Sequence, residues 1–239
     1  MKKYTIEYAY GKFIRDIFFV VNPIKKKVKK TRCIVHVFIN ERAVSNLKSE
    51  GYMDAYSYYR IHMNCLNQGT VWADQDFRSS NHFYNYKSGK GLYGFSNALN
   101  EFSKYYFKAF DFIKAGDDSK AAFYFGAALH LVQDSTVPQH AESRLLKEHR
   151  RFELWIIRKL LVGYYFRNYS GMKRYKDEKD YIRNNAVKAN EINEKYKFIN
   201  DREERYTKIS KEIVKEAQLT TTGIMLDYYD EIKKIKSSL

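Results

Sequence analysis

The sequence predicts an all-α protein, and three observations support this prediction. The 239 residues include only two prolines and 11 glycines, which argues against a turn-rich β protein. Apolar residues recur every three or four positions over long stretches, as on the buried face of a helix. With 44% hydrophobic residues, the chain can bury a sizeable core. We therefore expect one compact multi-helix domain at residues 31–239, preceded by a basic N-terminal arm at residues 1–30.

The expected helices follow one another along the chain. Helical spacing and capping residues predict helices at about residues 34–47, 52–66, 97–114, 117–134, 142–165 and 206–234. The second helix is expected to end before Asn67-Gln68-Gly69. Residues 70–94 lack periodicity, and so long a loop inside a domain is usually functional or disordered. The lysine-rich segment after Gly171 fits either a helix or a mobile loop.

The chain is basic, with a formal net charge of +15. Such a charge attracts anions, which include phospholipid head groups, nucleic acid and phosphate-bearing substrates. Between Lys176 and Lys215 acidic and basic residues are interspersed, which is typical of solvated helix faces. The run from Lys25 to Lys30 has no compensating acid, and it fits either a flexible basic arm or a contact with a membrane or polyanion.

Targeting and redox signals are weak. No segment is apolar and long enough to span a membrane. The apolar stretch at residues 14–21 is interrupted by two charged residues, and no convincing cleavage site follows it, so it makes a poor secretory signal. Cys33 and Cys65 form neither a disulfide framework nor a metal-ligand pattern, and we expect a buried free thiol. Localisation therefore stays open.

Three of the six histidines, His130, His140 and His149, fall within about twenty residues of one another. Asp134 and Glu153 follow the first and last of them by four positions, which places each pair on one face of a helix. Imidazole and carboxylate are the ligands that Zn²⁺ accepts when cysteine is not used. A single pair of this kind is most often a hydrogen bond on a helix surface, whereas two pairs around a third histidine indicate a metal site.

Further candidate ligands precede this region. They are His36 on an apolar helical face, and Asp74 and His82 in the expected loop. Taken singly, each has a simpler explanation: a core histidine, a turn-forming aspartate and a loop residue. His62 has no carboxylate at helical spacing, and we do not expect it to bind metal. Pro138 turns the chain so that a residue beyond it can reach back to the same cavity.

The region around the central pair resembles the core motif of the zinc-dependent bacterial phospholipases C and of their distant relatives, the P1/S1 single-strand nucleases. It reads Phe123-Tyr124-Phe125-Gly126-x-x-Leu129-His130-x-x-x-Asp134-x-x-x-Pro138-x-His140. Four other segments are also similar to the family: residues 36–43, 69–74, 81–84 and 217–230. The resemblance begins at Ile34 and leaves little room for an added lipid-binding domain. It implies a single helical domain of the phospholipase C and P1 nuclease type.

The resemblance also implies a ligand set for two or three Zn²⁺ ions per chain. One ion would be held by Asp74, His82, His130 and Asp134, a second by His140, His149 and Glu153, and a third by His36 and Asp134. In the family an N-terminal tryptophan completes the third site, but this chain has no tryptophan before Trp72. The third zinc is therefore completed otherwise, bound weakly or absent. Gln133 stands where the family tends to have glycine.

The function that the resemblance implies is a phospholipase C. Such an enzyme cleaves phospholipids to diacylglycerol and a phosphorylated head group by attack of a metal-bound water on phosphorus. Asp74 is the candidate that orients or deprotonates this water. The expected substrate is a phospholipid or membrane surface, and a monomer is expected. By family resemblance the protein would be secreted or membrane-associated.

Two alternatives remain. One is a P1/S1-like single-strand nuclease or another phosphodiesterase, for which nucleic acid would be the partner. The nuclease branch tends to end its motif with aspartate, whereas this chain has Glu153 four residues after His149, which favours the phospholipase. The other alternative is a non-catalytic basic helical domain that binds membrane or nucleic acid and keeps a structural zinc. The head-group preference stays open, because the segment between Asp74 and His82 is short and the family's choline-contacting aromatic residues have no secure counterpart.

Overall fold

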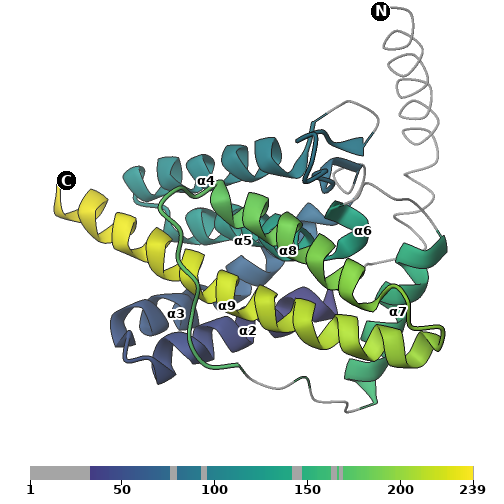
Figure 1. Ribbon diagram of the computed structural model, residues 1–239. Coiled ribbons are helices and arrows are strands. Elements are labelled where there is room, and N and C mark those ends of the chain that lie inside the picture. Colours follow the sequence, from purple (N-terminus) through teal and green to yellow (C-terminus); the bar gives the residue numbers. More distant parts are fainter. Residues whose placement is uncertain are drawn as a thin grey trace, which may run out of the picture.

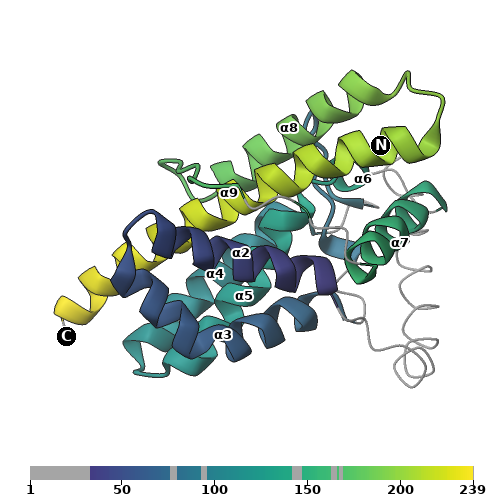
Figure 2. The ribbon, with the colours of Figure 1, turned by 90° about the horizontal axis from the view of Figure 1, so that it is seen from below.

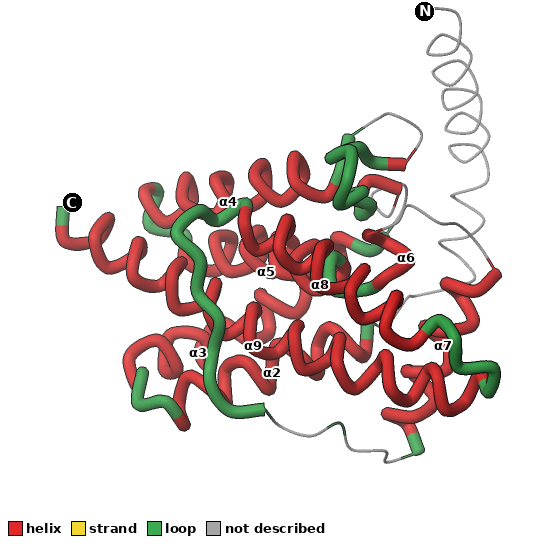
Figure 3. Tube along the Cα trace, viewed as in Figure 1, coloured by secondary structure: helices red, strands yellow, loops and turns green. Residues whose placement is uncertain are grey.

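The computed structural model describes residues 33–75, 80–92, 96–141, 147–162, 166 and 169–238. Within these residues the chain forms eight α-helices and no strand, which confirms the predicted all-α class (Figures 1 and 3). The helices are α2 (Ile34–Ser49), α3 (Met53–Ala73), α4 (Ala98–Lys114), α5 (Asp118–Asp134), α6 (Pro138–Ala141), α7 (Lys147–Leu161), α8 (Asp180–Tyr196) and α9 (Arg202–Ser237).

Side-chain caps fix where three of the helices begin. Asn97 and Asp117 precede α4 and α5, and each accepts a hydrogen bond from the backbone N–H three residues later. Asp201 does the same for α9, accepting from Glu204 N at 2.7 Å. Each cap satisfies a backbone donor that the first turn of a helix leaves unpaired. The cap at Asp201 explains why the last helix starts earlier than apolar spacing alone predicts.

The prediction that the second helix ends before Asn67 was wrong, because α3 continues to Ala73. The reason is packing against α5. A Cβ added at Gly69 would lie 1.7 Å from the carbonyl oxygen of Phe123, and one added at Gly126 would lie 1.9 Å from that of Leu66. Both glycines therefore serve the close approach of two helix backbones, and Gly69 does not mark a helix end.

Helix α5 lies at the centre of the fold, and every residue of its second half, from Phe125 to Asp134, is buried. Helices α3 and α4 pack against it, and the ring of Phe125 stacks on Tyr228 of α9 with centroids 3.9 Å apart. The long helix α9 crosses the molecule beside α2 and α8 (Figures 1 and 2). This arrangement buries the C-terminal half of α5 among three other helices.

The remaining expectations are met in part. The lysine-rich segment after Gly171 contains a helix, α8. The helix expected at 142–165 is described from Lys147 to Leu161, and Pro138 begins the short helix α6, where its missing N–H costs nothing. Both cysteines are free thiols, and Cys33 is buried, as expected. Among the described helices, none has the length and apolar character needed to cross a bilayer.

The predicted N-terminal arm, which includes the run from Lys25 to Lys30, lies outside the described residues. The division into an arm at residues 1–30 and a domain at 31–239 therefore stays a prediction.

The contact between α3 and α5 can be tested by replacing Gly126 with alanine. The added methyl group overlaps the backbone of Leu66, so we expect Gly126→Ala to lower the free energy of unfolding by about 3 kcal/mol. Gly116→Ala is the control, because nothing lies within 4 Å of its Cβ and only its positive φ of 76° is strained. That variant should cost about 1 kcal/mol in a denaturant titration. Equal costs for the two variants would contradict the close approach of the helices.

Candidate metal centre

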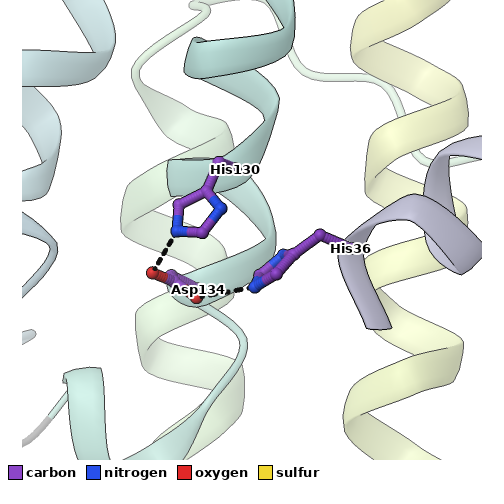
Figure 4. Close-up of side chains that lie close together, drawn as sticks. All are labelled: His36, His130 and Asp134. Atoms are coloured by element: carbon purple, nitrogen blue, oxygen red, sulfur yellow. Dashed lines mark ion pairs between the residues drawn. The ribbon is translucent and has the colours of Figure 1, made fainter. Parts of the chain in front are cut away.

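Five of the eight predicted ligands converge at the C-terminal end of α5. His130 and Asp134 lie one turn apart on this helix, and His36 reaches them from the first turn of α2 (Figure 4). Asp74 follows the last residue of α3, and His82 lies in the loop beyond it. Four separate segments thus bring their imidazole and carboxylate groups to one place.

The carboxylate of Asp134 is the centre of this group. Its Oδ2 lies 2.8 Å from His82 Nδ1 and 3.0 Å from His130 Nε2, and its Oδ1 lies 3.4 Å from His36 Nε2. The two nitrogens of His82 and His130 are themselves 3.1 Å apart. Asp134, His82 and His130 are all buried, whereas His36 is partly exposed.

The hydrogen bonds of His82 indicate that a cation is needed between its ring and Asp134. Its Nε2 lies 3.1 Å from the carbonyl oxygen of Ala73, which can only accept, so the ring proton is on Nε2. In the neutral ring Nδ1 is then a bare lone pair facing the anionic Oδ2 of Asp134. Two acceptors at 2.8 Å require a cation between them, either a second proton on the ring or a metal ion.

A chain of hydrogen bonds from the core determines the tautomer of His36, with the proton on Nδ1 and the lone pair on Nε2. The hydroxyl of Thr70 donates to a backbone carbonyl, that of Leu66 or Gly126, so its oxygen accepts from Asn40 Nδ2 at 3.1 Å. Asn40 Oδ1 then accepts from Gln133 Nε2 at 2.7 Å. Gln133 Oε1 must therefore accept from His36 Nδ1, at 2.9 Å. This order leaves the lone pair of His36 on Nε2, the nitrogen that faces Asp134.

This donor set fits zinc. His82 Nδ1, His130 Nε2 and Asp134 Oδ2 form a triangle with sides of 2.8, 3.0 and 3.1 Å. If both imidazoles are neutral, only one proton is available to these three atoms, so hydrogen bonds cannot account for all three short distances. Ligand atoms around a tetrahedral Zn²⁺ with bonds of about 2.0 Å are roughly 3.3 Å apart, which is close to these distances. Buried His130 Nδ1 also has no hydrogen-bond partner among the described residues.

Two groups of three side chains could each hold an ion. One consists of His36, His130 and Asp134, and the other of Asp74, His82 and His130, with the ligand atoms of each group within 4.8 Å of one another. His130 belongs to both groups, and Asp134 contacts members of both. A neutral imidazole binds one ion and a carboxylate can bridge two, so Asp134 is the side chain that two neighbouring ions could share.

The protonation states favour metal binding. Burial lowers the pKa of His130, and burial together with His130 lowers that of His36. These imidazoles are thus neutral near pH 7, as a ligand must be. Burial opposes ionisation of Asp134, but His130 and His140 hold its pKa well below the ordinary value, so the carboxylate stays charged.

Asp74 and Cys33 form a second contact beside the cluster. The thiol of Cys33 donates to Asp74 Oδ2 at 3.3 Å. Burial is the main reason that the pKa of Asp74 is raised. Burial and Asp74 raise the pKa of Cys33 far above its ordinary value, and the charges of Asp134 and Glu153 add to this rise, so the thiol is protonated.

Within the described side chains, the set expected for a separate ion is not seen as one group. It consists of His140, His149 and Glu153. His140 is buried, stacks on Phe83 with centroids 4.7 Å apart, and donates from Nδ1 to the carbonyl oxygen of His82 at 3.3 Å. The same Nδ1 is 3.9 Å from Asp134 Oδ2. Glu153 lies on α7 with an exposed side chain. The backbone of His149 belongs to α7, but its side chain lies outside the described part of the structure.

Two side chains at the centre were missed as functional residues by the sequence analysis. Asn40 follows His36 by one helical turn, and Gln133 follows His130 by three positions. The signal was the placement of buried amides at helical spacing from candidate ligands. Gln133 was noted only as a departure from glycine, although its amide bonds directly to His36.

Comparison with known proteins identifies the family. The family model described as zinc dependent phospholipase C matches residues 35–212, which contain every predicted ligand. The chain belongs to this family. No curated protein matches its sequence significantly. Membership confirms the family resemblance and confirms zinc as the expected cofactor.

Two solved structures share the fold of this zinc-dependent phospholipase C family member. The alpha toxin from Clostridium absonum superposes with a TM-score of 0.69 at 16% identity, over 83% of this chain and 63% of that one. The alpha-toxin of an avian strain, SWCP, of Clostridium perfringens superposes with a TM-score of 0.71 at 17% identity, over 84% and 64%. The chain thus spans less than two thirds of the length of either toxin.

The hydrogen bond from His36 to Gln133 can be tested through zinc affinity. Gln133→Leu removes the acceptor that fixes the His36 tautomer, and we expect it to weaken binding of the most weakly held zinc by about 10–100-fold. The measurement is a competition titration with a chromophoric chelator. Gln68→Leu, at an exposed position on α3, is the matched control and should bind zinc as the wild type does. An unchanged zinc affinity in Gln133→Leu would show that Gln133 has no role in orienting His36 for metal binding.

Proposed function

We propose that the protein is a zinc-dependent phosphodiester hydrolase, and most specifically a phospholipase C that releases diacylglycerol and a phosphorylated head group. The observation that carries this proposal is the buried carboxylate of Asp134, with imidazole nitrogens of His36, His82 and His130 within 3.4 Å of its oxygens. The family match over residues 35–212 supports the lipid substrate.

Each ligand has an assigned place in this proposal. Asp74, His82, His130 and Asp134 would hold one zinc, and His36 with Asp134 would hold a neighbouring one. The set expected for a further ion is His140, His149 and Glu153. When bound, zinc polarises the phosphodiester oxygens and lowers the pKa of a coordinated water to roughly 7.

Asp74 is the residue proposed to handle the proton of the attacking water. The Cys33 thiol engages its Oδ2, which orients the carboxylate without removing its charge. The raised pKa that burial gives Asp74 makes it a stronger base than an exposed aspartate. The products follow from hydrolysis of the bond between phosphorus and the glycerol oxygen, in which water supplies the hydroxyl group to phosphorus and a proton to the diacylglycerol.

The nuclease alternative shares this chemistry and differs in substrate. A glutamate at position 153, four residues after His149, follows the phospholipase pattern. The net charge of +15 favours any anionic substrate and does not separate lipid from nucleic acid. We propose a phospholipid as the partner and a monomer as the functional form.

Activity should depend on His130, which belongs to both groups of ligands. We expect His130→Ala to lower the rate of phospholipid hydrolysis by at least about a thousandfold, because it removes a ligand of one proposed zinc ion and an imidazole that contacts Asp134, the carboxylate shared with the neighbouring ion. His62→Ala is the matched control, since His62 packs on Tyr58 away from the cluster and should keep full activity. Turnover is followed by release of the phosphorylated head group, with single-stranded DNA as the competing substrate. Full activity in His130→Ala would disprove this active site.

Zinc content provides a separate test that needs no substrate. Protein purified without chelators should contain two or three zinc ions per chain by elemental analysis, because the proposed ligands form two neighbouring sites that share Asp134 and a further set at His140, His149 and Glu153. His130→Ala should lose at least one ion, and His62→Ala should lose none. A single ion that is retained in His130→Ala would indicate a structural site elsewhere.

A further inference from the structure

Helix α7 has two unlike faces. Its inner face packs Phe152 and Ile156, which are 1% and 5% exposed, in one cluster with Tyr206 and Ile213 of α9. On the other side Leu154 and Leu161 are 51% and 69% exposed, and Val162, directly after the helix, is 73% exposed. Apolar side chains that are this exposed, on a helix whose inner face is well packed, indicate an interaction surface.

Arginines alternate with these apolar residues. Arg150 and Arg158 are exposed, and at about 100° per residue they fall with Leu154 and Leu161 within an arc of roughly 80° around the helix. We call Arg150, Leu154, Arg158, Leu161 and Val162 the α7 outer face. It combines long cationic side chains with apolar ones on a single surface.

This combination identifies the partner by its chemistry. A second copy of the chain would place the same arginines against their own counterparts, which repels. Residues 1–32 contain ten Lys and Arg residues and two Asp and Glu residues, so they would bring like charge to the arginines. An anionic bilayer offers phosphates to the guanidinium groups and hydrocarbon to the leucines, while the arginine stems lie along the interface.

We propose that the α7 outer face docks the protein onto an anionic phospholipid bilayer. The proposal rests on the proposed function, because a phospholipid hydrolase has to bring its metal centre to the membrane surface. The same helix carries His149 and Glu153, two of the proposed zinc ligands. It is fixed to α9 through Glu203, which accepts from Trp155 Nε1 at 2.6 Å and pairs with Lys159. Docking through α7 therefore orients the metal centre relative to the lipid.

The test measures binding and hydrolysis separately, with full-length zinc-loaded protein. Leu161→Asp/Val162→Asp should bind vesicles of phosphatidylglycerol and phosphatidylcholine at least about tenfold more weakly in a sedimentation assay. In Arg150→Gln/Arg158→Gln the affinity for these vesicles should fall about fivefold per arginine, and the affinity for vesicles of pure phosphatidylcholine should change little. Ile61→Asp, at a 77% exposed position on α3, is the matched control and should bind as the wild type does.

Hydrolysis of a short-chain phospholipid below its micellar concentration shows whether the centre itself is intact. We expect Leu161→Asp/Val162→Asp to keep the zinc content and the monomer rate of the wild type while losing activity on vesicles. Vesicle binding equal to that of the wild type would overturn the proposal, as would a change of oligomeric state in place of a change in vesicle binding. A wild type that binds vesicles through α7 but hydrolyses no phospholipid would instead disprove the proposed function and leave docking intact.

Discussion

The candidate centre depends on one electrostatic constraint, the burial of the Asp134 carboxylate among imidazoles. A buried charge is costly unless a partner compensates it. Here the nearest atoms are imidazole nitrogens. The tautomer of each ring is determined by the hydrogen bond of its other nitrogen, to the Ala73 carbonyl at His82 and to Gln133 at His36. Because those tautomers turn lone pairs toward Asp134, the arrangement calls for cations in its middle. Zinc ions at this position would satisfy the carboxylate and the imidazoles together.

The same constraint links the metal centre to the helical core. The tautomer of His36 is fixed by a chain of hydrogen bonds through Gln133 and Asn40 to Thr70, which lies where α3 and α5 approach each other. That approach requires Gly69 and Gly126, since any side chain there would overlap the opposite backbone. The orientation of His36, a predicted ligand on α2, is therefore determined by packing between two other helices.

The sequence predicted the helices better than it predicted their contacts. Periodicity and caps located α4 and α5 closely, because both signals are local. They failed at Gly69, since a glycine that ends a helix and one that admits a neighbouring backbone look alike until the neighbour is known. The buried amides of Asn40 and Gln133 escaped notice for the same reason: their partners are 30 and 97 residues away in the chain.

The predicted ligands are brought together to different degrees, and the reason is physical. His36, His82, His130 and Asp134 lie on or beside α2, α3 and α5, which pack around one core and hold their side chains in fixed positions. Helix α7 instead packs in a separate cluster with α9. The positions of its predicted ligands therefore depend on how α7 packs, and the charge of Glu153 raises the pKa of both Cys33 and His130. In the proposed arrangement α7 both presents its outer face to lipid and carries two of the predicted ligands, so membrane docking would be coupled to the metal centre. A displacement of α7 at a membrane would also move the carboxylate of Glu153 relative to α5.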